Sequence, residues 1–284
     1  MGYGDDLLIT ALAHKIKKKF PGRQIVIGSA KKKRAYHSIV YDNNPNISDC
    51  RNLDNTKPIH IIDYHVSNRP YIDYNKSSSS KYIWKKFKPE PGQIFFSEEE
   101  KISAKKIIIE AKTYWKENNE DKYKGIIFLE TSSTKLNDKQ FGIKQRNKDW
   151  GEDNWRQLID IIKKEFLIIK SIHNESKKTR GVYSPEKMDF RLACAVLNEA
   201  DLYVGPEGGF GHVAAALNKK AVIYFGGWIS PETIGYDLHE NLFYKDKLSP
   251  CGEYKKLCKH CDDARKAISV DLFLKHINKI FTNL

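Results

Sequence analysis

The sequence predicts an α/β protein whose main sheet is parallel and doubly wound. Two observations predict this class: from residue 125 onward, short apolar runs alternate with segments of helical length, and glycine-rich turns join several of them. Repeated β-α-β units of this size make successive strands parallel and place helices on both faces of the sheet. Because ligands of such sheets bind at the carboxyl ends of the strands, functional residues are expected there.

The first half of the chain is predicted to open with an amphipathic helix at residues 7–20, in which Leu8, Leu12 and Ile16 recur at four-residue spacing. Two strands, a further apolar run and a second helix follow at residues 24–28, 59–64, 94–96 and 98–115. The polar, highly charged residues 116–124 then predict a domain boundary. We expect one domain at residues 1–120, a second at residues 121–269, and a C-terminal helix at residues 270–284 that packs back on the first domain.

The second half is more regular. Its predicted strands lie at residues 125–129, 167–172, 202–204 and 221–225, and its predicted helices at residues 155–166, 190–200 and 211–217. Asp153 or Asn154 is expected to cap the first of these helices, because short polar side chains accept hydrogen bonds from the free N–H groups of a helix start. This alternation of strand and helix is the main support for a parallel sheet.

Length and composition agree with a folded protein of two domains. The chain has 284 residues, of which 40% are apolar and 30% charged, so it can bury a core, and a disordered chain is excluded. It contains no run of 18 apolar residues, and residues 1–6 are too polar and acidic for a secretory signal. We therefore expect a cytoplasmic protein, and five cysteines, an odd number, fit a reducing compartment.

The net charge of +13, from 49 Lys and Arg against 36 Asp and Glu, is the unusual bulk property. It is typical of proteins with an anionic partner, such as a phosphorylated substrate, a nucleic acid or a membrane surface. A lysine-biased composition explains it equally well, because only nine of the basic residues are arginine. Both interpretations stay open, and the run Lys31, Lys32, Lys33 and Arg34 is a dense local example of this charge.

The most informative segment is a glycine-rich turn after the strand at residues 202–204. Glu207 is followed there by residues 208–212, Gly-Gly-Phe-Gly-His, and by a helix of small residues. Glycines let the backbone approach a ligand closely, and a helix start offers free N–H groups, so a phosphate or diphosphate is the expected ligand. The spacing is neither the dinucleotide-binding fingerprint nor a Walker loop. A purely structural turn is the alternative.

Two acidic residues mark the start of the first helix. Gly4 is followed by Asp5 and Asp6, and the apolar helical pattern begins directly after them. An aspartate here is either a general base facing a ligand in a cleft or an N-cap that accepts helix N–H bonds. Two adjacent aspartates allow one residue for each role.

A third cluster joins hydroxyl side chains to a lysine. Ser132, Ser133 and Thr134 follow the strand at residues 125–129, and Lys148 precedes the helix at residues 155–166. Hydroxyls and a lysine at the carboxyl edge of a sheet suit phosphate oxygens. A solvated loop without a ligand is the alternative.

In this order, the motifs resemble the ADP-heptose:lipopolysaccharide heptosyltransferase family, glycosyltransferase family 9. The resemblance rests on Gly4-Asp5 with the helix after it, on Lys148-x-Trp150 and on the turn at residues 207–212. It also includes residues 225–227, Phe-Gly-Gly. The resemblance implies a GT-B fold, in which two Rossmann-like domains with parallel sheets face each other across a cleft.

The resemblance also implies an inverting, metal-independent transfer of a sugar, heptose or a related one. The donor is a nucleoside-diphosphate sugar, with an ADP-sugar favoured, the acceptor is a surface glycan or a lipid-linked saccharide, and no cofactor is expected. Asp5 lies where that family carries its base. The residues implied to hold the donor are Ser132, Ser133, Thr134, Lys148, Glu207, Gly208, Gly209, Phe210, Gly211 and His212.

The resemblance to a glycosyltransferase also suggests a role for the run of basic residues near the N-terminus, on the side of the acceptor. Lys31, Lys32, Lys33 and Arg34 lie in the expected acceptor half, where they would attract a phosphorylated glycolipid or the anionic inner face of a membrane. Two other functions stay open. One is an enzyme that modifies the nucleotide sugar alone, of the epimerase type. The other is a basic nucleic-acid-binding protein, which is disfavoured because arginine, the preferred base-reading residue, is scarce.

Three cysteines near the C-terminus have a suggestive spacing. Cys251, Cys258 and Cys261 form C-x6-C-x2-C, with His260 adjacent. The spacing is compatible with a metal knuckle, but no second cysteine pair follows at zinc-finger spacing. Reduced packing thiols are therefore favoured, and no metal is expected.

Overall fold

The computed structural model describes residues 2–119, 121–131, 146–171, 179–186 and 188–282. Within these residues the strands form two sheets, one of five strands in the order β5-β4-β6-β7-β8 and one of three in the order β2-β1-β3. Every pair of neighbouring strands in the five-stranded sheet is parallel. The predicted α/β class with a parallel sheet is confirmed.

The five-stranded sheet is built from the second half of the chain. Its strands are β4 (Ile126–Leu129), β5 (Leu167–Lys170), β6 (Leu202–Pro206), β7 (Lys220–Gly226) and β8 (Glu240–Phe243). The chain adds β5 on one side of β4 and then returns to add β6 on the other side. The strand order therefore reverses between β4 and β6, and a sheet of this kind binds its ligand in the crevice at such a point.

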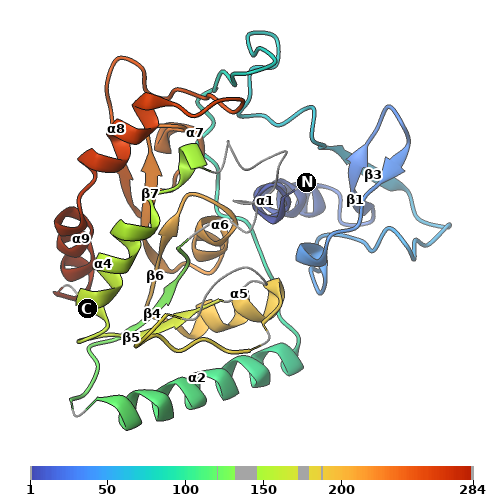
Figure 1. Cartoon of the computed structure of the whole chain (residues 1–284). Coiled ribbons are helices and arrows are strands. Elements are labelled where there is room, and N and C mark those ends of the chain that lie inside the picture. Colours follow the sequence, from blue (N-terminus) through green and yellow to red (C-terminus); the bar gives the residue numbers. More distant parts are fainter. Residues whose placement is uncertain (1, 120, 132–145, 172–178, 187, 283–284) are drawn as a thin grey trace.

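Helices cover both faces of this sheet (Figure 1). They are α4 (Glu152–Ile162), α5 (Phe190–Glu199), α6 (Gly209–Ala216), α7 (Pro231–Ile234), α8 (Lys259–Ala267) and α9 (Val270–Thr282). Strand β4 shows why both faces are apolar: Ile126 and Phe128 belong to the core under α5 and α6, whereas Ile127 and Leu129 belong to the core under α4 and α9. Alternate residues of a strand point to opposite faces, so a strand covered on both sides is apolar throughout.

The first part of the chain forms the smaller sheet and two long helices. Its elements are α1 (Tyr3–Lys19), β1 (Gln24–Ser29), β2 (Arg34–Ala35), a 3₁₀ turn η1 (Ile39–Tyr41), β3 (Ile59–Asp63) and α2 (Glu98–Asn118). Strands β1 and β3 are parallel, and β1 and β2 form an antiparallel pair. Helix α1 contacts β1 on one side and α6 on the other (Figure 1). It therefore joins the two sheets.

The buried face of α1 differs from the predicted one. Leu12 is 44% exposed, whereas Leu7 and Ala13 are fully buried. The four-residue pattern assumed one packing surface, but α1 is covered by η1 and β1 on one side and by α6 on the other. The cap predicted for α4 is also wrong, because that helix begins after Gly151 and has no side-chain cap.

Two helices pack in places that the sequence did not predict. The helix α2 precedes the expected boundary near residue 120, yet it packs against α5 and β5 of the five-stranded sheet. The helix α9 packs against α4 and β7, with Phe273, Ile277 and Ile280 buried in the second core. This corrects the expectation that helix 270–284 packs back on the first domain. The boundary itself stays a prediction.

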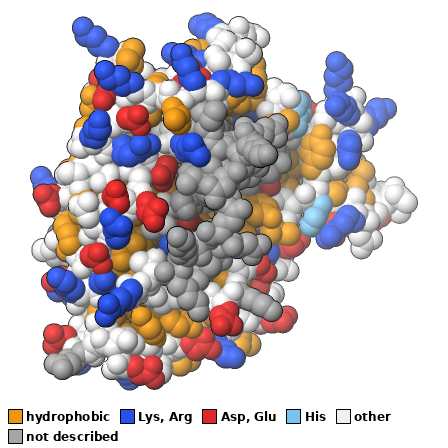
Figure 2. Space-filling view, in the orientation of Figure 1, with side chains coloured by type: hydrophobic (Ala, Val, Ile, Leu, Met, Phe, Trp, Pro, Cys, Tyr) orange, Lys and Arg blue, Asp and Glu red, His pale blue; other side chains and the backbone are white. Residues whose placement is uncertain are grey.

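Lys and Arg side chains are spread over the visible face, with Asp and Glu among them (Figure 2). Among the described residues, no helix is both long enough and apolar enough to span a membrane.

A buried arginine connects the two parts of the fold, and its removal is expected to destabilise the protein. Arg191, 7% exposed, donates hydrogen bonds to the carbonyl oxygens of Ile39 and Phe95 and forms an ion pair with Glu100. We predict that Arg191→Ala costs about 3 kcal/mol, because it leaves a partly buried carboxylate unpaired. A thermal melt should show a fall in Tm of roughly 6 °C or more.

The exposed pair between Arg156 and Asp153 gives the control. Both side chains are more than half exposed, at 65% and 78%, so Arg156→Ala should change stability by less than about 0.5 kcal/mol. Equal Tm values for the Arg191 and Arg156 variants would contradict the proposed role of Arg191.

Candidate active site

The candidate site begins at the carboxyl end of β6, beside the point where the strand order reverses. Glu207 follows this strand directly, Gly208 caps α6, and the helix begins at Gly209. The first N–H groups of a helix and its dipole make this position favourable for an anion. The predicted glycine-rich turn into a helix is therefore present, with the helix two residues earlier than predicted.

An ion pair holds the acidic residue of the turn. Lys148 Nζ contacts Glu207 Oε2, and the two side chains are only 15% and 8% exposed. The same ammonium lies 5.1 Å from the ring centroid of Trp228, within range of a cation–π interaction. Lys148, distant in sequence, therefore lies beside the glycine-rich turn. This leaves a cation and a helix N-terminus close together.

His212 lies in the first turns of α6 and is almost completely buried, at 6% exposure. Its Nδ1 shares a hydrogen bond of 2.8 Å with the hydroxyl of Tyr236. Burial lowers the pKa of His212, and the nearby carboxylates of Glu207 and Asp5 oppose that shift. The imidazole is therefore neutral near pH 7, and its hydrogen bonds, rather than a positive charge, are what it can offer a ligand.

Asp5 lies in the first turn of α1 and is held by three partners. Arg69 forms an ion pair of 2.9 Å with its Oδ2, and the hydroxyls of Tyr71 and Tyr64 donate to its Oδ1 at 2.5 and 3.2 Å. Burial raises the pKa of both tyrosines, so they remain protonated donors. The N-cap of α1 is Gly2, without a side-chain cap, so the capping interpretation of Asp5 is wrong.

Asp6, the adjacent carboxylate, has different partners from Asp5. It accepts hydrogen bonds from Ser38 at 2.7 Å and from Tyr41 at 3.3 Å, and burial raises its pKa. Asp6 therefore ties α1 to η1 and the segment before it. Of the two aspartates, Asp5 is the one whose charge raises the pKa of His212.

The two helix starts meet at glycines. A Cβ added at Gly4 would lie 2.8 Å from His212 Cδ2, closer than real contacts allow, and 3.3 Å from the Cα of Gly209, which is a tight contact. Next to this contact, Tyr3 and Phe190 stack with ring centroids 4.4 Å apart. Asp5, Glu207 and Lys148 all influence the pKa of His212, so the structure brings these four side chains into one neighbourhood.

Not all predicted site residues belong to this neighbourhood. Lys31, Lys32 and Lys33 are exposed in the turn between β1 and β2. Arg34, also exposed, is the first residue of β2 and lies over the ring of Tyr36. Ser132, Ser133 and Thr134 lie outside the described residues, so the structure neither supports nor contradicts their predicted role.

Sequence reasoning missed four contributors to the site: Arg69, Tyr64, Tyr71 and Trp228. No local signal could have identified Arg69, because its partner Asp5 belongs to α1, far earlier in the chain. Trp228 follows the Phe-Gly-Gly motif, which marked its neighbourhood without indicating its contact with Lys148.

A polar cavity lies elsewhere in the described part of the chain. It has a volume of about 720 Å³ and is lined by polar residues that include Asp42, Glu100 and Arg191, but by none of the predicted site residues. Tyr41, which donates to Asp6, forms part of its wall. The cavity therefore adjoins the Asp6 side of α1.

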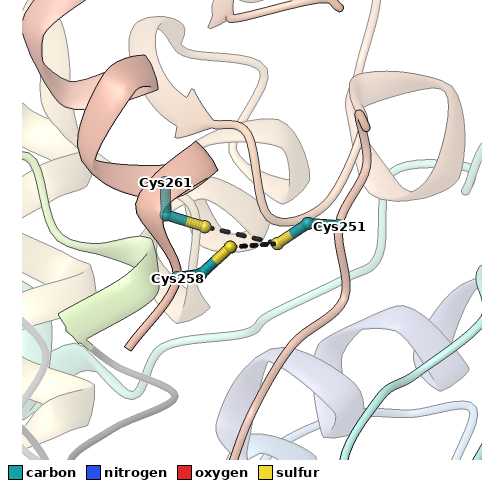
Figure 3. Close-up of side chains that lie close together, drawn as sticks. All are labelled: Cys251, Cys258 and Cys261. Atoms are coloured by element: carbon teal, nitrogen blue, oxygen red, sulfur yellow. Dashed lines mark hydrogen bonds between the residues drawn. The ribbon is translucent and has the colours of Figure 1, made fainter. Parts of the chain in front are cut away.

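The three C-terminal cysteines come together in space (Figure 3). Cys251 Sγ lies 3.3 Å from Cys261 Sγ and 3.7 Å from Cys258 Sγ. Hydrogen bonding from the Cys261 thiol lowers the pKa of Cys251, whereas the pKa of Cys261 is raised. His260 is not directed at this cluster: its Nδ1 lies 3.1 Å from Asp246 Oδ2, and its Nε2 lies 3.2 Å from the carbonyl oxygen of Gly227.

The five-stranded parallel sheet, with helices on both faces and a glycine-rich turn at the carboxyl end of β6, defines an α/β fold of the predicted class. Residues 139–261 match the family model of "Glycosyltransferase family 9 (heptosyltransferase)". This match spans less than half of the chain and agrees with the glycosyltransferase family that the motifs resemble.

Two solved structures share the fold over the whole chain. The glycosyl transferase family 9 protein from Veillonella parvula DSM 2008 matches with a TM-score of 0.60 and 13% identity, covering 100% of this chain and 96% of that one. The iron-containing dodecameric glycosyltransferase TibC from enterotoxigenic E. coli H10407 matches with a TM-score of 0.63 and 13% identity, covering 100% and 74%. No curated protein sequence matches the chain significantly.

Proposed function

We propose that the protein is an inverting glycosyltransferase that moves heptose or a related sugar from an ADP-sugar to a surface glycan or a lipid-linked saccharide. One observation carries this proposal. The start of α6, with the Lys148–Glu207 ion pair, faces Asp5 across the Gly4 contact, at the point where the strand order reverses. A helix start beside a lysine, together with a carboxylate on the neighbouring helix start, supports a sugar transfer with a diphosphate leaving group, in which the first would bind the diphosphate and the second would be the base.

Asp5 acts as the base in this proposal. It removes the proton from the acceptor hydroxyl, whose oxygen attacks the anomeric carbon as the bond to the diphosphate breaks. A single displacement of this kind inverts the configuration of that carbon. Arg69 and the two tyrosines fix the carboxylate in one orientation, which is what a positioned base needs.

The leaving diphosphate is stabilised by the second domain. The N–H groups at the start of α6 and the ammonium of Lys148 lie where the negative charge of the leaving group grows. Glu207 is placed to accept hydrogen bonds from the donor sugar, and His212, being neutral, contributes a hydrogen bond. Ser132, Ser133 and Thr134, which follow β4, complete the diphosphate site in this proposal. No metal ion is required for this stabilisation of charge.

The acceptor belongs to the side of the three-stranded sheet. The exposed run Lys31, Lys32, Lys33 and Arg34 attracts an anionic glycolipid or the inner face of a membrane, and the protein acts in the cytoplasm. This charge is the only observation in favour of a nucleic-acid partner, and it is explained equally well by the glycolipid.

A thermal-shift series tests the donor. ADP at about 100 times its dissociation constant adds about 2.7 kcal/mol, so Tm should rise by roughly 5 to 10 °C. AMP, which lacks the second phosphate, should give a clearly smaller shift, and so should GDP, UDP and CDP. The donor site is wrong if none of these nucleotides stabilises the protein.

Product analysis separates the remaining functions. Incubation with the ADP-sugar should give a glycosylated product only when a glycan acceptor is present. An altered ADP-sugar formed without acceptor would instead identify the epimerase type of enzyme. Stabilisation by DNA or RNA but not by any nucleotide would favour the nucleic-acid partner.

A further inference from the structure

The cysteine cluster has the geometry of a metal site. Cys251 Sγ lies 3.3 Å from Cys261 Sγ and 3.7 Å from Cys258 Sγ, and all three sulfurs lie within 4.8 Å of one another. Zn²⁺ lies about 2.3 Å from each thiolate sulfur in a tetrahedral site, which separates the sulfurs by roughly 3.8 Å. One ion can therefore contact all three sulfurs after small side-chain movements.

The backbone around the cluster is already fixed by hydrogen bonds. Cys258 caps α8, and the N–H of Cys261 in its first turn donates to the carbonyl oxygen of Cys258 at 3.0 Å. The buried side chain of Asn147 accepts from the N–H of Cys258 at 3.0 Å and donates to the carbonyl oxygen of Glu253 at 2.9 Å. Two of the three thiols thus lie at a helix start, where thiolates are stabilised.

The cluster is separate from the other polar side chains near it. His260 forms hydrogen bonds with Asp246, with Ser249 Oγ at 3.1 Å and with the carbonyl oxygen of Gly227. Both ring nitrogens therefore bind groups of the surrounding loops and not the cysteine sulfurs. Within the described part of the chain, no fourth Cys, His, Asp or Glu completes the group. A tetrahedral ion would carry water or a small thiol at its fourth position.

The loop that carries Cys251 also supports the donor side of the candidate active site. The N–H of Cys251 donates to the carbonyl oxygen of Gly227 at 3.0 Å, and that of Gly252 donates to the carbonyl oxygen of Trp228 at 3.1 Å. The indole of Trp228 donates in turn to the carbonyl oxygen of Glu253 at 2.7 Å. The ring held in this way is the one that Lys148 covers.

We propose that Cys251, Cys258 and Cys261 bind one thiophilic divalent metal ion, Zn²⁺ or Fe²⁺, and that this ion braces the loop under Trp228. Thiolate ligands select such ions, and three ligands from two segments cross-link those segments. The ion is structural and does not touch the substrate. The effect on donor binding rests on the proposed function, whereas the binding of metal does not.

Metal analysis of the full-length protein, purified without a histidine tag under reducing, anaerobic conditions, tests the site. We expect about one equivalent of zinc or iron per chain, and less than about a tenth of an equivalent in Cys258→Ser. Cys50→Ser removes a thiol away from the cluster and is the matched control, so it should retain the full equivalent. Full metal content in Cys258→Ser would overturn the proposal.

Reconstitution distinguishes the metal from a disulfide. Protein treated with chelator should regain one equivalent from Zn²⁺ alone and lose three reactive thiols at the same time. A protein that takes up no Zn²⁺, or whose mass is two hydrogens lower because Cys251 and Cys261 are oxidised, would contradict the proposal. Because metal uptake is measured without substrate, a failure of ADP to bind leaves this result intact, and the reverse also holds.

Discussion

Asp5→Asn is expected to lower the turnover of sugar transfer by about 10²- to 10⁴-fold, the usual contribution of a positioned general base. Asparagine keeps the shape of the side chain and an oxygen that accepts from Tyr71, but it cannot take a proton. The stabilisation by ADP should stay nearly unchanged, because Asp5 lies on α1, whereas the proposed diphosphate site is at the start of α6. The measurement is a steady-state rate beside a thermal shift with ADP.

Asp6→Asn is the matched control, since it makes the same chemical change one residue further along the same helix. The Asp6 side chain faces Ser38 and Tyr41, which donate to its two different oxygens. Asparagine keeps one accepting oxygen, and its NH2 group can donate to the oxygen of the other hydroxyl. Its turnover should stay within a few-fold of the parent protein. If the Asp5 variant keeps its turnover, or if only the Asp6 variant loses it, the assignment of the base is wrong.

The partners of Asp5 also explain how a carboxylate on a helix can serve as a base. Arg69 neutralises one oxygen, and Tyr71 and Tyr64 donate to the other. Each carboxylate oxygen can accept more than one hydrogen bond, so the acceptor hydroxyl can approach without displacing these groups. The side chain therefore keeps its orientation while it takes the proton.

The strands of the second half could be predicted because they are covered on both faces. Runs such as residues 126–129 are apolar at every position, and this is visible in the sequence. Strand β8 could not be predicted in the same way. It lies at the edge of the sheet, and within Glu240–Phe243 only Leu242 is buried, so no apolar run marks it.

The candidate site likewise has one part that a local sequence motif predicts and another that depends on tertiary contacts. Glu207 and the residues after it form one local motif, and the start of α6 could be inferred from it. The pairing of Asp5 with Arg69 depends on how a loop folds over α1, and the contact of Lys148 with Trp228 depends on the loop before α8. Such contacts join distant segments, and neither periodicity nor turn chemistry encodes them.

Lys148→Met is expected to lower kcat/KM by about 10²- to 10³-fold, the usual cost of losing one group that stabilises charge in a transition state. The variant also leaves the buried carboxylate of Glu207 without its partner, at a cost of about 3 kcal/mol in stability. A loss of activity in this variant alone is therefore ambiguous. It reports either the missing ammonium or the unpaired carboxylate.

The double variant Lys148→Met with Glu207→Gln resolves the two effects, because it removes the unpaired charge along with the lysine. Its Tm should return close to that of the parent protein. If Lys148 stabilises the leaving diphosphate, kcat/KM of the double variant stays about 10²-fold below that of Glu207→Gln alone, and the stabilisation by ADP falls as well. Equal kcat/KM values for Glu207→Gln with and without the lysine substitution would show that Lys148 serves only to neutralise Glu207, and the diphosphate would then have to be bound by the start of α6 without it.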